Sequence, residues 1–292
     1  MYYCIANFED IEEHRKMLTV ISDITEEYYN LLAEKEQALT HFLFSNNYYK
    51  MLFMNIDELL NYIKEIENKE SKTAFEMEEC FLNVNRLTIN FLGLFFSYIN
   101  HYEKDLKDFT GKDSEQVKKF KNITSKYFDK HFEYRFFYKL RNYSIHCTIP
   151  ITSINSSIVN PTKRYCIDID SLLDNYNDWG PIVKKDLESI DTIDIKKIMQ
   201  DSKKMFNELH KELVLINNFD IYKNIEIIQK NKPQNINCPI ILVSNSIEDF
   251  KSGKFNFFDP FRTAERSIYE IHKLGIISSL IYKKDKGSAS FR

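Results

Sequence analysis

The segment from Arg135 to His146 holds the side chains of this sequence that are best suited to chemistry on a phosphate. Two arginines, Arg135 and Arg141, are followed by Asn142 and by a histidine, His146. A guanidinium can neutralise a phosphate, and an imidazole can accept or donate a proton at neutral pH. This combination of residue types favours proton transfer and charge stabilisation at a phosphodiester bond.

The apolar residues of this segment recur at the spacing of an amphipathic helix. With 100° of turn per residue, they form a core stripe around Leu140. The opposite arc contains no acidic residue, which favours an anion or a partner protein as its occupant. The core stripe is predicted to comprise Phe132, Phe136, Phe137, Leu140, Tyr143 and Cys147, and the arc His131, Tyr134, Arg135, Tyr138, Arg141, Asn142, Ile145 and His146.

Arg141 and His146 are the predicted catalytic residues, and Asn142 and Tyr138 are predicted to support them. Arg141 and His146 lie about 140° apart on a helix, and Ile145 is the apolar residue between them. This arrangement predicts a homodimer through the same helix face, in which a two-fold axis brings two arginines and two histidines around one cleft. The alternatives are structural: a helix-terminal histidine that favours the helix dipole, and an arginine in a salt bridge.

The stretch Arg141-Asn142-Tyr143-Ser144-Ile145-His146 resembles the signature of the HEPN superfamily. That signature is an Arg, often a polar residue, and a His four to six residues after the Arg. The resemblance covers roughly residues 74 to 217. It implies a HEPN-like helical bundle and a metal-independent endoribonuclease, in which a 2′-hydroxyl of the RNA attacks the adjacent phosphate. In that reading Arg135 and His131 contact the RNA.

Family members of this kind act in toxin–antitoxin or phage-defence systems and cut tRNA or other RNA. The resemblance therefore implies an RNA substrate and an antitoxin or defence-system partner protein. Two other classes stay open at this point. One is a catalytically silent HEPN-like module that binds a protein or a nucleotide, and the other is a helical scaffold without an active site.

The composition of the sequence limits which binding partners, metal sites and cellular locations are expected. The net charge is −3, so an RNA site must be a local patch. Five scattered cysteines without a CxxC pair argue against zinc and against a disulfide framework, and reduced thiols fit a cytoplasmic protein. We predict no metal and no cofactor. The start of the chain does not have the pattern of a signal peptide, and its most apolar window is too short to span a membrane.

The fold class predicted from periodicity is mainly α, with a β-hairpin after the motif helix and a small mixed α/β segment towards the C-terminus. Asp170 or Ser171 is predicted to cap a helix, in preference to a metal site at Asp168 and Asp170. Helices are predicted at 9–40, 55–69, 75–106, 113–147, 182–188, 193–216 and 260–274, a hairpin at 151–159 and 163–169, and a strand at 239–244. The predicted regions are an N-terminal helical region (1–72), the HEPN-like domain (73–217), a mixed segment (218–282) and a disordered tail (283–292).

Overall fold

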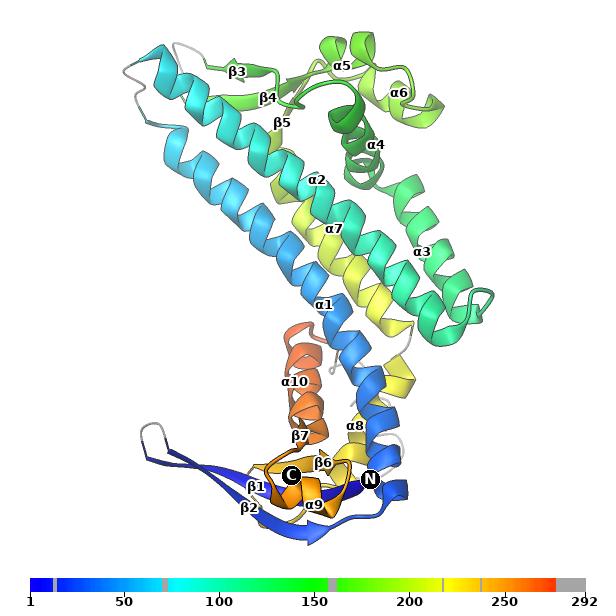
Figure 1. Ribbon diagram of the computed structural model, residues 1–292. Helices are drawn as coiled ribbons and strands as arrows, with labels where there is room; N and C mark the ends of the chain where they lie inside the picture. The colour runs from blue at the N-terminus through cyan, green and yellow to red at the C-terminus, as the bar shows by residue number, and fades with distance from the viewer. Residues whose placement is uncertain (13–14, 70–72, 157–161, 217, 237, 277–292) are drawn as a thin grey trace. The chain divides into compact units, whose positions relative to one another are not determined.

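Long helices dominate the chain, and two small antiparallel sheets accompany them (Figure 1). The structure is a computed structural model that describes residues 1–12, 15–69, 73–156, 162–216, 218–236 and 238–276. The predicted mainly-α class is confirmed. None of the described helices combines the length and the apolar character that a membrane span requires. The chain divides into a helical unit, residues 45–216, and a sheet unit, residues 1–44 with 217–292.

The helical unit is built on α2 (Ala74–Thr110), α3 (Glu115–Lys130), α4 (Phe132–His146), α7 (Ile195–Leu215) and the second half of α1 (Glu26–Ile66). Thr73 begins α2 by accepting a hydrogen bond from the Glu76 N–H, and Gly111, with a φ of 92°, ends it. Figure 1 shows α2 and α7 side by side, and the rings of Phe91 and Phe206 meet between them at 5.9 Å. The aromatic core between these helices fixes the inner face of α4.

A bend at His131 separates α3 from α4, where the sequence predicted one helix over 113–147. His131 has extended backbone angles, φ −114° and ψ 114°, so it ends one helix and begins the next. Its ring stacks on Tyr127 at 4.9 Å. The prediction of a single helix was wrong because periodicity continues through a one-residue break and does not reveal it.

The predicted hairpin after the motif helix is confirmed. β3 (Ser153–Asn155) pairs antiparallel with β4 (Arg164–Asp168), and a third strand that was not predicted, β5 (Thr192–Asp194), joins β4 on its other side. Part of the predicted hairpin, residues 157–161, lies outside the described residues. Two helices, α5 (Ile169–Asn175) and α6 (Pro181–Leu187), follow β4. The cap of α5 is Asp168, whose carboxylate accepts from the Ser171 N–H, so the predicted cap at Asp170 or Ser171 was wrong.

A buried polar cluster joins α1, α2 and α7 inside the helical unit. The His210 ring is fully buried and stacks on Tyr49 at 3.8 Å. Its Nδ1 lies 2.8 Å from the Tyr98 hydroxyl, and its Nε2 lies 3.0 Å from Oδ1 of Asn46. A neutral ring with its proton on Nε2 satisfies both contacts, since Tyr98 donates and Asn46 accepts. Burial lowers the pKa of His210 to about 3.

This cluster predicts that the helical unit loses stability in mild acid. Below about pH 6.5 the unfolded chain protonates His210 while the folded chain does not, so each pH unit costs up to about 1.4 kcal/mol. Between about pH 6.5 and 5 we expect the wild type to lose about 1.6 kcal/mol more than the His210→Gln protein, because the unfolded histidine is already half protonated at about pH 6.5. Urea unfolding at both pH values measures this difference. His272→Gln, at an exposed histidine, is the control and should keep the wild-type pH dependence; equal losses in wild type and His210→Gln would contradict the prediction.

The sheet unit begins with two strands where the sequence predicted a helix. β1 (Tyr2–Glu12) pairs with β2 (Arg15–Asp23) on one side and with β6 (Pro239–Ser244) on the other, and β7 (Asn256–Phe258) completes the order β2-β1-β6-β7. The predicted helix over 9–40 was therefore wrong at residues 9–12 and 15–23, its residues 13–14 lie outside the described residues, and its part from Glu26 onwards is confirmed as α1. The β-branched run Thr19, Val20 and Ile21 favours a strand, and the helical spacing of the apolar residues around it was coincidental.

Three further helices belong to this unit: α8 (Asn218–Lys230), α9 (Ile247–Lys251) and α10 (Pro260–Lys273). The predicted strand at 239–244 and the predicted helix at 260–274 are confirmed as β6 and α10. The contact boundary falls inside α1, which is one continuous helix where the sequence predicted two. The predicted boundary at 72 therefore falls inside the helical unit, whereas the predicted boundary at 217 lies one residue from the end of that unit; residues 1–44 and 217–292 belong together. The predicted tail, 283–292, lies outside the described residues.

Candidate functional site

Helix α4 carries the predicted site, and its inner face is anchored as the sequence predicted. Phe136, Phe137, Leu140 and Tyr143 are all fully buried. Phe137 meets Phe91 of α2 at 4.8 Å, edge to face. Because this stripe is locked into the core, the side chains on the opposite side of α4 have defined directions. Two members of the predicted stripe differ: Phe132 is half-buried, and Cys147, where the helix ends, is exposed.

One residue of the predicted polar arc, Tyr134, lies in the core. Tyr134 is only 3% exposed and lies between Phe95, at 5.2 Å, and Tyr127, at 6.4 Å. Burial raises the pKa of the Tyr134 hydroxyl, so this group is neutral. The prediction placed Tyr134 on the exposed arc because a helical wheel does not account for α3, which covers that side of α4.

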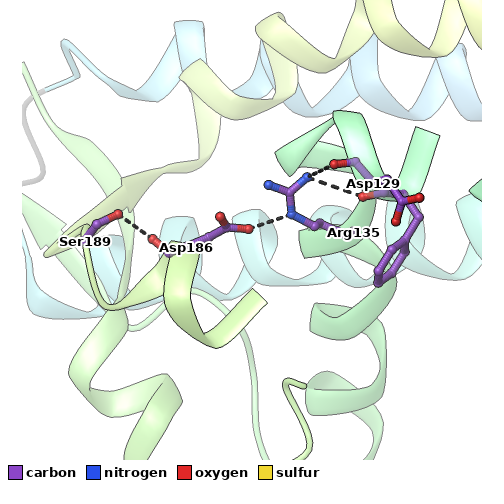
Figure 2. Close-up of polar contacts among 5 residues, drawn as sticks. Asp129, Arg135, Asp186 and Ser189 are labelled. Atoms are coloured by element: carbon purple, nitrogen blue, oxygen red, sulfur yellow. Dashed lines mark hydrogen bonds and ion pairs between the residues drawn. The ribbon is translucent and has the colours of Figure 1, made fainter. Parts of the chain in front are cut away.

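The guanidinium of Arg135 is held by hydrogen bonds within the fold. Its Nε donates to the Asp186 carboxylate of α6 at 2.6 Å, and its Nη1 donates to the carbonyls of Phe128 and Asp129 at 3.3 Å each. Figure 2 shows the guanidinium between Asp186 on one side and the end of α3 on the other, and the side chain is only 11% exposed. These bonds tie α4 to α3 and α6. An RNA contact by Arg135 would compete with them, so we leave Arg135 out of the proposed site.

Arg141 has a different environment. Its guanidinium carbon lies 4.0 Å from the centre of the Phe96 ring, and its Nη1 donates to Oδ1 of Asn142 at 3.1 Å. In the described part of the chain no carboxylate forms an ion pair with it. Stacking on an aromatic ring holds a guanidinium in place and leaves donors at its edge for an anion. Of the two arginines in the segment, only Arg141 is thus placed to bind a phosphate.

A groove of about 240 Å³ lies beside Arg141, between α2 and α4. Gly93 contributes a backbone without a side chain, and nothing lies within 4 Å of where a Cβ would stand. The groove is lined by Ile89, Leu92, Gly93, Phe96 and Ser97 of α2 and by Arg141, Ser144 and Ile145 of α4. Arg141 is therefore the one charged residue in the lining of a mostly apolar groove, in which Ile145 is 56% exposed.

His146 is the last residue of α4, and its side chain is exposed. It stands one helical turn after Asn142 and does not line the groove beside Arg141. The regular helix keeps the angle of about 140° between Arg141 and His146. Within one chain these two side chains consequently point to different sides of α4.

The remaining predicted residues separate into two groups. Tyr138 is exposed one turn before Arg141, and its ring centre lies 6.2 Å from that of Phe96, so it belongs to the same surface. His131 lies at the bend between α3 and α4, stacked on Tyr127, five residues before Phe136 and away from the groove lining. The structure thus brings Tyr138, Arg141 and Asn142 together, and it places His131 and Arg135 elsewhere.

Helix α2 carries an exposed apolar row that was not predicted from the sequence, and we call it the α2 row. Its members recur every seven residues and are Phe75, Leu82, Ile89 and Phe96. The first three are 74%, 52% and 38% exposed, and the last two line the groove. This heptad spacing was visible in the sequence, but the buried face of α2 is apolar as well and obscured it. An exposed apolar row of this length is typical of a protein–protein contact.

No group of histidine, cysteine, aspartate and glutamate side chains in the described ranges is arranged to hold a metal ion. Comparisons with known protein families, with curated proteins and with solved structures find no match to this chain. Its resemblance to the HEPN superfamily therefore depends on the motif of α4 and its context alone.

Proposed function

We propose that this protein is an endoribonuclease of HEPN type that acts as a homodimer, with Arg141 and His146 as its catalytic residues. The observation that best supports this proposal is the environment of Arg141. A guanidinium that is stacked on Phe96 and has no carboxylate partner in the described part of the chain is prepared to bind a phosphate. The exposed His146 at the end of the same helix supplies the group that moves protons.

The proposed reaction uses the RNA's own 2′-hydroxyl as the nucleophile. The 2′ oxygen forms a bond to phosphorus, and the bond from phosphorus to the 5′ oxygen of the next nucleotide breaks. One imidazole accepts the proton of the 2′-hydroxyl, and a second imidazole gives a proton to the leaving oxygen. Arg141 stabilises the charge that develops on the phosphorane. The products are a 2′,3′-cyclic phosphate and a 5′-hydroxyl end, and the chemistry needs no metal because arginine and histidine supply charge and protons.

This reaction requires two imidazoles near one phosphate, and a single α4 supplies one. A two-fold axis beside Ile145 would place His146 and Arg141 of two copies around a shared cleft. The exposure of Ile145 and of the α2 row supports such a contact, because burying both removes apolar surface from water. Asn142 lies one turn before His146 and can orient its ring, while Tyr138 borders the same surface.

The biological setting that fits this activity is toxin-like, in phage defence or in a toxin–antitoxin pair, with tRNA as one candidate substrate. The same apolar surface offers a site for an antitoxin or defence-system protein, which would silence the enzyme by blocking the contact between two copies. All five cysteines are free, which fits a cytoplasmic location.

The Ile145→Glu protein is expected to be a monomer and to cleave RNA on the order of 10²-fold more slowly than the wild type, because misplacing the partner's groups costs about this factor. A carboxylate at the centre of the proposed contact would be buried without a partner in each copy. Light scattering at low micromolar concentration measures the oligomeric state, and cleavage of labelled total RNA and tRNA measures activity.

Ile182→Glu on α6 is the matched control, since Ile182 is 51% exposed and lies outside the groove. It should leave both dimer and activity unchanged. A monomeric Ile145→Glu protein with full activity would refute the shared site. A dimeric wild type that cleaves no RNA would instead favour a silent binding module.

A further inference from the structure

Strand β2 is an outer edge of the four-stranded sheet and is exposed on that side. It pairs with β1 alone among the described strands. Its middle residues, from Met17 to Ser22, carry no charge, and Val20 and Ile21 are 43% and 49% exposed. Natural sheets normally protect such edges with charges, prolines or a covering element. An uncharged apolar edge of this length favours pairing with another strand.

The direction of each backbone group of β2 follows from two hydrogen bonds of β1. The Ile24 N–H donates to the Tyr3 carbonyl, and the Phe8 N–H donates to the Cys238 carbonyl of the segment before β6. Odd-numbered residues of β1 therefore point their backbone groups towards β2, and even-numbered residues point towards β6. Since Asn7 stands opposite Thr19, Thr19 bonds inwards.

The neighbours of Thr19 consequently bond outwards. Leu18 and Val20 direct their N–H and C=O groups away from β1, to the open edge. Leu18 stands opposite Phe8 and Val20 opposite Ala6 in a regular stretch, and the bulge at Ile21 interrupts the ladder only beyond it. A second strand can thus form hydrogen bonds with two adjacent outward positions.

We infer that this edge pairs antiparallel with β2 of a second copy of the chain, with Thr19 on the two-fold axis. In this register Leu18 of each copy stands opposite Val20 of the other, and the two pairs exchange four backbone hydrogen bonds. The two Thr19 residues face each other as a non-hydrogen-bonded pair, with Cα atoms about 4.5 Å apart.

The strand is complementary to itself in this register, and this favours a second copy over other occupants. Leu18 covers the exposed Val20 of the other copy on one face of the sheet, and Thr19 meets Thr19, a favourable cross-strand pair. Met17 stands opposite Ile21, so no like charges oppose each other between Met17 and Ile21. A contact between two strands of this length buries less than the roughly 1,200 Å² of surface that a stable interface buries. We therefore infer a weak, reversible pairing.

A cysteine at position 19 tests the register directly. The Thr19→Cys protein is prepared with the exposed Cys147 and Cys238 replaced by serine. The expected Cα separation of about 4.5 Å suits a disulfide. Ser22→Cys is the matched control on the same exposed strand, because in this register the two Ser22 positions lie about 20 Å apart. Under mild oxidation, we expect Thr19→Cys to form a linked dimer at least about tenfold faster than Ser22→Cys.

A proline provides the second variant. Val20→Pro removes an outward N–H and leaves the inward bonds of β2 to β1 intact. Added to Thr19→Cys, it should reduce linking to the rate of Ser22→Cys. Equal rates for Thr19→Cys and Ser22→Cys would overturn the proposal. Unchanged linking in the Val20→Pro protein would overturn it as well. Neither readout involves RNA, so the result is independent of the proposed ribonuclease activity.

Discussion

We expect the His146→Ala protein to cleave RNA on the order of 10²–10⁴-fold more slowly than the wild type, since this is the usual contribution of a positioned proton-transfer group. Expression of the wild type should slow growth, and expression of the variant should not. The proposed reaction moves two protons, and in both steps the nearest group of the motif that can exchange one is His146. Removing its ring therefore removes both transfers at once.

The fold should tolerate this substitution. His146 is exposed at the end of α4, and exposed substitutions of this kind change stability by less than about 0.5 kcal/mol. Circular dichroism and urea unfolding check this point. His272→Ala, at another exposed histidine in the last turn of a helix, α10, is the matched control and should cleave at the wild-type rate. A folded His146→Ala protein with unchanged cleavage would remove His146 from the mechanism.

The core face of α4 was predictable because burial there follows the helical period, so Phe136, Phe137 and Leu140 could be identified from spacing alone. The different environments of Arg135 and Arg141 could not be predicted in this way. Arg135 is paired with Asp186, 51 residues later, and only the path of the chain through α5 and α6 brings them together. Local spacing contains no information on such a partner. It therefore placed both arginines at the site, Arg141 as a catalytic residue and Arg135 as an RNA contact, and the structure separates them.

The sheet unit was mispredicted in its N-terminal strands for a related reason. Its strands β1 and β6 are neighbours in space but lie more than 200 residues apart in the chain. A strand is stabilised by its neighbours more than by its own propensity, so β1 and β2 could not be recognised without β6. The apolar residues of the first 24 positions fit a helix equally well when they are considered alone. The same holds for the bend at His131, where the packing of α3 against α4 decides the break.

A second large loss of cleavage is expected when the RNA substrate itself is changed. An RNA with a single 2′-deoxy nucleotide at the cut site should not be cleaved there, whereas the all-ribose RNA is cut. The attacking oxygen of the proposed reaction is the 2′-hydroxyl, and hydrogen in its place leaves no nucleophile. Cleavage of the all-ribose RNA should also continue undiminished in excess EDTA, because Arg141 and His146 together supply charge stabilisation and proton transfer. Gel analysis of end-labelled RNA measures both, and a magnesium-dependent ribonuclease serves as the EDTA control.

The chemical ends of the products decide between this route and attack by water. Attack by the 2′ oxygen leaves a 2′,3′-cyclic phosphate and a 5′-hydroxyl, so a kinase should label the downstream fragment without prior phosphatase treatment. Attack by water activated on a metal ion would cut the deoxy substrate equally well and would stop in EDTA until magnesium is restored. Either result would refute the roles given to Arg141 and His146, since a carboxylate-bound metal would then perform the work that the surface around Arg141 is proposed to do.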